Sequence, residues 1–190
     1  KFKDSKAVVV NEEEYTADNI IIATGSDSKC PPVEGLQLPG VINSTQLLSI
    51  DHLPKRLCII GAGVIGMEFA SVFSSFGTQV TVVEFLKECL PVLDSDIAKR
   101  LRQTIGKRGV EFSMQSAVKS ITETTDAEGN RQLTVNYEKK GKPLHTDADL
   151  VLIATGRKPN TEGLELEMAG VEYSPKGINV DDDFQTTTAN

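Results

Sequence analysis

The sequence predicts an α/β protein, a Rossmann-like three-layer domain with a parallel sheet and an antiparallel β-meander as one of its crossovers. Three observations favour this fold class. Strand-like and helix-like runs alternate along the middle of the chain. A glycine-rich turn joins one strand to the next helix. Before a later apolar strand, apolar and polar residues alternate over a long stretch. Alternating strands and helices are typical of parallel sheets with right-handed crossovers.

The chain before the glycine turn combines short apolar runs with a proline-rich connection. Residues 7–10 and 19–25 are rich in β-branched and apolar residues, which predicts two short strands, the second of them buried and ended by a glycine. Residues 26–40 contain three prolines and two glycines, which indicates a linker and not a packed element. A short helix is expected next, with Ser44 or Thr45 as its N-cap.

The central helices and strands follow one another regularly. Apolar spacing predicts a helix over 64–76 that stops at Gly77, and a second helix over 97–107. Strands are predicted at 57–60, 79–84 and 109–112.

A different pattern occupies residues 117–146. Apolar and polar residues alternate there, and turn residues at 126–130 and 141–143 divide the stretch, so an antiparallel meander is predicted. A buried strand at 150–154 follows. The phrase Ile-Ala-Thr-Gly occurs at both 22–25 and 153–156, which suggests two related nucleotide-binding units of which only one is complete.

Composition excludes several classes of function. A net charge of −7 argues against a nucleic-acid or anionic-membrane partner, because both demand a basic surface. No apolar run approaches the roughly 20 residues that span a bilayer, and the N-terminus does not resemble a signal peptide. Cys30, Cys58 and Cys89 form no CxxC or CxxxxC pair, so no metal site or local redox disulfide is predicted. We expect these thiols to be reduced, buried or half-buried, and the protein to be cytoplasmic.

The glycine turn carries the chemistry. It consists of Gly61, Ala62, Gly63, Val64, Ile65 and Gly66, with a strand before it and a helix after it. Gly61 permits the sharp turn, Gly63 lets the backbone approach a pyrophosphate, and Gly66 allows close packing of the helix on the strand. The helix N-terminus offers free N–H groups to phosphates. The alternative is a tight turn that binds nothing.

Two glutamates lie near this turn. Glu84 ends the next strand, about 20 residues beyond the glycines, where a carboxylate accepts hydrogen bonds from the adenosine ribose and repels a 2′-phosphate. Phe85 and Leu86 follow it and supply no arginine, so NAD is favoured over NADP. The alternative for Glu84 is a solvated residue at a strand end. Glu68 lies in the helix near the crevice, or serves only as a partner of the helix dipole.

Several segments together resemble the flavoprotein pyridine-nucleotide disulfide oxidoreductases, and most closely their dihydrolipoamide dehydrogenase members. These segments are 21–26, 53–56, 61–68, 82–85, 154–160 and 184–186, in the family's order. The resemblance implies that Gly61 to Glu68 hold the NAD phosphates and that Glu84 holds the ribose. It also implies that Val118 flanks the adenine and that Gly156 approaches the nicotinamide half. Glu68 would lie near the nicotinamide and flavin, and Thr24, Gly25 and Ser26 would pass close to FAD.

The resemblance also implies a domain organisation. Residues 1–43 would be remnant strands of the FAD domain with a linker, 44–180 the NAD domain, and 181–190 the start of the return to the FAD domain. The FAD glycine motif, the CxxxxC pair and the His-Glu dyad of the family are missing. The chain is therefore expected to bind NAD(H) without turnover, and to contain no catalytic residue of its own. A chain beginning near Ser44 is expected to lose little stability.

The intact parent enzyme would be a homodimer with FAD, an FAD domain, a dimerisation domain and lipoyl-bearing protein partners. One alternative is an NADH oxidase or another reductase of the same family; glutathione and mercuric reductases, which favour NADP, fit Glu84 less well. An alternative of another class is a non-catalytic NAD-sensing or interaction module.

Overall fold

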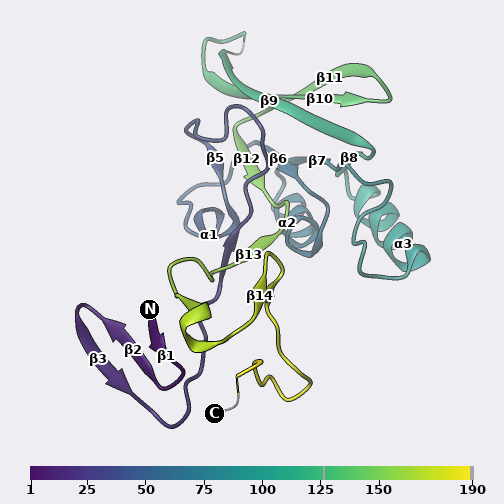
Figure 1. The fold of residues 1–190 in the computed structure, drawn as a ribbon. Coiled ribbons are helices and arrows are strands. Elements are labelled where there is room, and N and C mark those ends of the chain that lie inside the picture. Colours follow the sequence, from purple (N-terminus) through teal and green to yellow (C-terminus); the bar gives the residue numbers. More distant parts are fainter. Residues whose placement is uncertain (126, 189–190) are drawn as a thin grey trace. The chain divides into compact units, whose positions relative to one another are not determined.

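The computed structural model describes residues 1–125 and 127–188, and its chain forms two compact units (Figure 1). One unit is Ser28–Gly156, and the other combines Lys1–Asp27 with Arg157–Asn190. Each is described by itself. The domain boundaries expected from the sequence stay a prediction. Asp126, the first residue of the turn expected at 126–130, lies outside the described residues.

A five-stranded parallel sheet forms the centre of the Ser28–Gly156 unit. Its strands, in spatial order, are β5 (Val41–Ile42), β12 (Leu150–Ile153), β6 (Arg56–Ile60), β7 (Gln79–Val83) and β8 (Glu111–Ser113). β6 lies in the middle, and the order of the strands reverses there, because β7 follows on one side and β12 on the other. Crevices at the carboxyl ends of strands beside such a reversal are where open α/β sheets bind ligands.

The sheet has a different layer on each face, which confirms the three-layer prediction. Leu57 and Ile59 of β6 share a core with α2 (Val64–Ser75) and α3 (Ser95–Gly106), whereas Cys58 and Ile60 share a core with the meander. Alternate residues of a strand point to opposite faces, so one strand serves both cores. The meander consists of β9 (Ser116–Thr125), β10 (Arg131–Lys139) and β11 (Lys142–Ala148).

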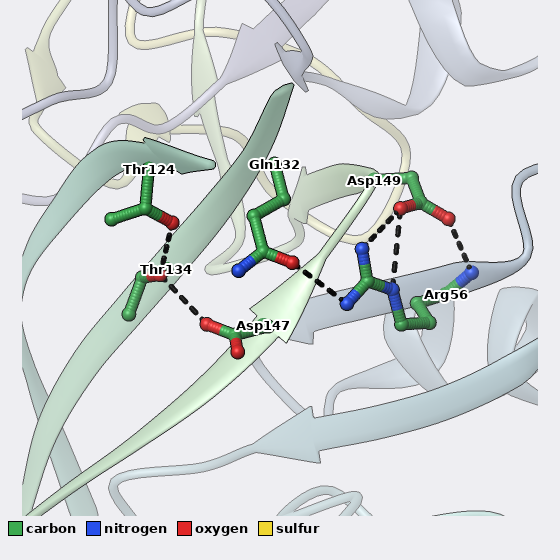
Figure 2. A network of polar contacts seen from close by, with 6 residues as sticks. All are labelled: Arg56, Thr124, Gln132, Thr134, Asp147 and Asp149. Carbon is green, nitrogen blue, oxygen red and sulfur yellow. Dashed lines mark hydrogen bonds and ion pairs between the residues drawn. The ribbon is translucent and has the colours of Figure 1, made fainter. Parts of the chain in front are cut away.

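Polar contacts tie the meander to the start of β6 (Figure 2). The Arg56 guanidinium donates to Asp149 Oδ1 from Nη2 at 2.6 Å and from Nε at 3.2 Å, and its Nη1 donates to Gln132 Oε1 at 2.9 Å. Beside them, Thr134 bonds to Thr124 and donates to Asp147. These contacts lie at the end of β6 opposite the glycine turn.

The proline-rich segment before α1 (Ser44–Leu47) is packed, so the prediction of a linker was wrong. Val33, Leu36 and Leu38 pack against the meander-side core. The Ile121 N–H donates to the Glu34 carbonyl at 2.8 Å, and a Cβ on Gly35 would lie 2.0 Å from the Ile121 oxygen. The segment is packed because its apolar residues lie against this core and because glycine permits the close approach to Ile121.

The expected N-cap of α1 was also wrong. The N-cap is Asn43, whose side chain accepts the Gln46 N–H at 2.9 Å while the Gln46 side chain accepts the Asn43 N–H. This reciprocal capping satisfies two backbone donors at once, which neither Ser44 nor Thr45 does here.

The other unit contains a three-stranded antiparallel sheet of β1 (Phe2–Asp4), β2 (Ala7–Val10) and β3 (Glu13–Thr16). It also contains β13 (Arg157–Pro159), which pairs with β4 (Ser26–Ser28), then η1 (Leu166–Ala169), β14 (Tyr173–Ser174) and β15 (Gly177–Ile178). The strand predicted at 7–10 is confirmed. The buried strand predicted at 19–25 was wrong, since no described strand pairs with residues 20–25 and Ile21 is 90% exposed.

Two of the three cysteines are buried as expected. Cys58 lies in β6 and Cys89 in the connection after β7, whereas Cys30 is exposed, against expectation, in the irregular connection after β4. None of the three forms a disulfide. Among the described residues, no helix is long and apolar enough to cross a membrane.

Candidate functional site

The turn between β6 and α2 is shaped by two glycines that the fold itself requires. Gly61 has a φ of +109°, and a Cβ there would lie 2.4 Å from the Ala154 carbonyl oxygen. A Cβ on Gly66 would lie 2.1 Å from the Gly61 carbonyl oxygen. Any larger residue at either position would collide with backbone. These glycines therefore bring the helix close to its strand.

Gly63 differs from both. Its φ is −74°, which any residue adopts, and no heavy atom lies within 4 Å of the position of a Cβ. It is the N-cap of α2 and has no side-chain capping bond. In the described part of the chain, nothing accepts the backbone N–H groups of Gly63, Val64, Ile65 or Gly66. The turn therefore presents free donors and open space at the positive end of a helix dipole.

Glu84 is held against this turn by its own carboxylate. Oε2 accepts the Ala62 N–H at 2.5 Å, and Oε1 accepts the Leu86 N–H at 2.7 Å. The Glu84 backbone bonds to Ser113 and Ser116, so β8 and β9 also fix its position. One half-buried carboxylate thus joins the ends of β6 and β7.

A cleft of about 510 Å³ opens at the carboxyl ends of these strands. Gly61, Glu84 and Val118 all line it, so three of the predicted site residues meet there. Its walls are mainly apolar. Phe85, which is 73% exposed, Ala117 and Val118 are among the apolar residues that line it. An apolar cleft with one carboxylate suits a flat ring attached to a polyol.

Other predicted residues lie apart from the cleft lining. Gly156 follows β12 with a φ of +114°, and its carbonyl accepts the Lys29 N–H at 2.9 Å. Its neighbour Thr155 lines the cleft and donates to the Lys29 carbonyl at 2.8 Å. Glu68 is exposed on α2 and makes no hydrogen bond or ion pair that the structure records.

Thr24, Gly25 and Ser26 belong to the other unit. The Thr24 hydroxyl donates to the Asn160 carbonyl at 2.7 Å, and the Asn160 N–H donates to the Gly25 carbonyl at 3.0 Å. Ser26 Oγ accepts from Arg157 Nε at 2.7 Å. The repeated Thr-Gly pair therefore makes the same kind of contact in each unit. The threonine hydroxyl donates to the carbonyl of one residue and the glycine carbonyl accepts the N–H of that same residue, which is Asn160 in one unit and Lys29 in the other.

Comparison with known proteins identifies the family. The model of the family described as pyridine nucleotide-disulphide oxidoreductase matches residues 1–190. The chain belongs to this family. Its curated relatives include a dihydrolipoamide dehydrogenase of Chaetomium thermophilum, 39% identical over 97% of this chain and 38% of that protein. A leghemoglobin reductase of Glycine max is 38% identical over 90% of this chain and 32% of that protein.

A solved structure of another member supports the same fold. The HOCl-induced flavoprotein disulfide reductase RclA of Escherichia coli, as its Cu(II) complex, matches with a TM-score of 0.85 and 34% identity. The match covers 100% of this chain and 42% of that one. The chain spans 38% and 32% of the length of the two relatives above, and 53% of a dihydrolipoyl dehydrogenase of Acholeplasma laidlawii. Some of them, from Pisum sativum and Arabidopsis thaliana, are named as mitochondrial, so the cytoplasmic location stays a prediction.

Several residues at the site had no place in the sequence-based prediction. Pro31 and Pro32 line the cleft although they were assigned to a linker. That two prolines follow one another was the only feature of the sequence that could have drawn attention to them. Leu90 donates its N–H to the Ala62 carbonyl at 2.9 Å, with a φ of +49°. A leucine gives no sequence signal of a left-handed conformation, because such positions usually carry glycine or asparagine.

Proposed function

We propose that the Ser28–Gly156 unit is the NAD(H)-binding part of a flavoprotein disulfide oxidoreductase. In the intact enzyme the reaction would be oxidation of dihydrolipoamide by NAD⁺ to lipoamide and NADH. The names of the relatives support this choice of substrate. The 190-residue chain itself would bind NAD(H) without turning over.

One observation carries the proposal, namely the glycine at position 63. Neither its φ nor any neighbour requires glycine, in contrast to Gly61 and Gly66. A ligand that approaches the backbone closely accounts for the missing side chain. The free N–H groups and the helix dipole beside Gly63 attract an anion. The diphosphate of a dinucleotide satisfies both conditions, and the residues present therefore fit NAD.

Glu84 supports the choice between NAD and NADP. Its carboxylate already accepts two backbone N–H groups, one on each oxygen, and each oxygen retains a second lone pair. Those lone pairs would accept the hydroxyls of the adenosine ribose. A 2′-phosphate would meet a fixed negative charge there, so we propose NAD as the cofactor.

The remaining roles are those that the family resemblance implies, and of their residues only Val118 lines the cleft. Val118 and the apolar walls would hold the adenine, and Gly156, beyond β12, would approach the nicotinamide half. Glu68 would face the nicotinamide end from α2. When bound, NAD⁺ supplies the hydride acceptor; the residues of this chain only bind and orient it.

FAD and the partners belong to the proposal for the longer enzyme. Thr24, Gly25 and Ser26 would contribute one edge of an FAD site, while the redox cysteines, the dimerisation domain and the lipoyl-bearing partner would lie outside these residues. A homodimer is proposed for that enzyme. The alternative is a reductase or oxidase of the same family with another substrate, which the likeness to RclA and to leghemoglobin reductase supports.

The test is a pair of alanine substitutions with titration of NAD and NADP. Gly106 is the matched control for Gly63, because it also lacks a positive φ and a Cβ there would meet nothing closer than 4.0 Å. We expect both variants to melt like the wild type. Gly63→Ala should lose about tenfold or more in NAD affinity, since one misfit methyl costs of order 1–3 kcal/mol.

Three outcomes would count against the proposal. Unchanged NAD affinity in Gly63→Ala would remove the observation that carries it. Equal affinity of the wild type for NAD and NADP would contradict the role of Glu84. Reduction of lipoamide by NADH with the purified chain alone would contradict its expected inactivity.

A further inference from the structure

The segment after β7 fastens the middle of the glycine turn. The Ala62 N–H donates to Glu84, and the Ala62 carbonyl accepts the Leu90 N–H at 2.9 Å. Both backbone polar groups of Ala62 are therefore bonded to residues of one short segment, 84–90. Leu90 is buried in the helix-side core together with Cys89, which anchors this end of the segment.

The bond from Leu90 sets the direction of a neighbouring donor. The Ala62 carbonyl and the Gly63 N–H belong to one peptide unit, which is planar and trans, so they point in opposite directions. Holding the carbonyl toward Leu90 therefore turns the Gly63 N–H to the other side. Gly63 tolerates either sign of φ, so its own backbone does not prevent this peptide from flipping. A flipped peptide would present a carbonyl oxygen where an anion should bind.

An ion pair holds the segment that supplies Leu90. Arg102 of α3 donates to Glu88 through Nε at 2.5 Å and through Nη2 at 2.9 Å, one bond to each carboxylate oxygen. Glu88 Oε1 also accepts the Cys89 N–H at 3.1 Å, and the Cys89 thiol donates to the Ala98 carbonyl at 3.3 Å. The two side chains are only 26% and 24% exposed, so the pair is partly shielded from water. Arg102 itself does not line the cleft.

We propose that Arg102 is a positioning residue for the diphosphate subsite. Through Glu88 it fixes Leu90, Leu90 holds the Ala62 carbonyl, and the Gly63 N–H is thereby kept ready to donate to a phosphate oxygen. The inference rests on the proposed dinucleotide site, and adds to it a residue on α3 that does not line the cleft. Preorganised donors strengthen anion binding because they need no reorientation when the ligand arrives.

The test compares two arginine–carboxylate ion pairs, one between α3 and the connection after β7 and one at the start of β6. Arg56→Leu is the control for Arg102→Leu, because Arg56 also bonds a carboxylate through two nitrogens and that pair is 30% and 32% exposed (Figure 2). Each variant of the full chain is titrated with ADP and with adenosine. Adenosine lacks the diphosphate, so its affinity measures binding to the cleft without any contribution from the glycine turn. Melting temperatures are measured for all variants.

The expected pattern separates positioning from general stability. Arg102→Leu should bind ADP about tenfold more weakly and adenosine within about twofold of the wild type. Arg102→Lys keeps the charge but cannot bond both carboxylate oxygens of Glu88 with a planar guanidinium. Its ADP affinity should therefore fall between those of the wild type and Arg102→Leu. Glu88→Gln should show the same weakening of ADP binding as Arg102→Leu, with adenosine affinity again close to that of the wild type. Arg56→Leu should lower the melting temperature and leave the ratio of ADP to adenosine affinity unchanged.

Three results would overturn the inference while the proposed function stands. The first is ADP affinity in Arg102→Leu equal to that of the wild type. The second is an equal loss of affinity for ADP and for adenosine in Arg102→Leu, and the third is the same selective loss of ADP affinity in Arg56→Leu. If Arg102→Leu fails to fold, the ratio of ADP to adenosine affinity in Arg102→Lys and Glu88→Gln tests the inference instead. A wild type that binds neither ADP nor NAD would instead refute the dinucleotide site itself, and this inference with it.

Discussion

The Ala62 backbone N–H and the Glu84 carboxylate are joined by a hydrogen bond of 2.5 Å, which links the glycine turn after β6 to the end of β7. This contact exists within the chain itself and needs no nucleotide. Glu84 therefore has a structural role in addition to the proposed contact with ribose. The residue type at position 84 is constrained by the turn as well as by the cofactor.

Glu84→Gln should destabilise the chain even without nucleotide. The carboxylate accepts the Ala62 and Leu86 N–H groups with one oxygen each, whereas a glutamine has one acceptor oxygen and an NH₂ group that would face a donor. Losing one bond and leaving a donor unpaired costs about 1–3 kcal/mol. Urea unfolding of the nucleotide-free chain measures this difference.

Glu111→Gln is the control for that substitution. Glu111 is exposed on the neighbouring strand β8, and its side chain makes no hydrogen bond or ion pair that the structure records. The control removes the same charge from the same sheet, so its free energy of unfolding should stay within about 0.5 kcal/mol of the wild type. If the two variants unfold at the same urea concentration, the structural role of Glu84 is refuted.

The three cysteines should differ sharply in reactivity toward a thiol reagent. Burial raises the pKa of the Cys58 thiol to about 12 and that of Cys89 to about 11, whereas Cys30 is exposed. Only thiolates react, so the two buried groups are protected by both access and charge. We expect one rapidly labelled thiol per native chain and three in urea. Cys30→Ser should abolish the rapid phase, and rapid labelling that persists in this variant would contradict the burial of the other two.

The pair of Glu88 and Arg102 should support stability only above acidic pH. Its hydrogen bond from Arg102 lowers the pKa of Glu88 from 4.5 to about 2. A depressed carboxylate pKa stabilises the fold above the unfolded value, and this stabilisation is lost as the pH falls from about 4.5 toward 2. The difference in unfolding free energy between the wild type and Arg102→Leu should therefore be constant from pH 7 to 5 and shrink below that. A difference that is as large at pH 3 as at pH 7 would contradict this.

Much of the fold followed from local patterns in the sequence. Four of the five parallel strands, all but β5, and also α2, α3 and the meander, have patterns of apolar residues that depend only on near neighbours. The role of Gly66 was also visible, because its position in the motif predicts the close approach that a Cβ would prevent. The family resemblance rested on motifs in their order along the chain, and the comparisons confirm it.

What the sequence did not reveal depends on contacts between distant residues. Residues 20–22 have the composition of a strand, but a strand also needs a partner, and no described strand pairs with them. The proline-rich segment packs against the core through contacts that include the close approach of Gly35 to Ile121, which lies far along the chain. The bond from Leu90 to Ala62 likewise joins residues that no local pattern connects.

The packing of residues 28–43 reverses the expectation that a chain beginning near Ser44 keeps its stability. Val33, Leu36, Leu38 and Val41 are partly buried against the meander-side core, and Val41 also belongs to β5 at the edge of the parallel sheet. The prediction concerns the free energies of unfolding of two chains, one of residues 28–156 and one of residues 44–156. The shorter one should lose about 3 kcal/mol or more, on the basis of the apolar area of four half-buried side chains.

The control for this comparison lies within the segment itself. Gly35→Ala in the 28–156 chain puts a Cβ 2.0 Å from the Ile121 oxygen, at a φ of +91°, and should detach the segment without shortening the chain. Its free energy of unfolding, measured in urea, should fall toward that of the 44–156 chain. Equal stability of the 28–156 and 44–156 chains would mean that residues 28–43 lie on the core without stabilising it.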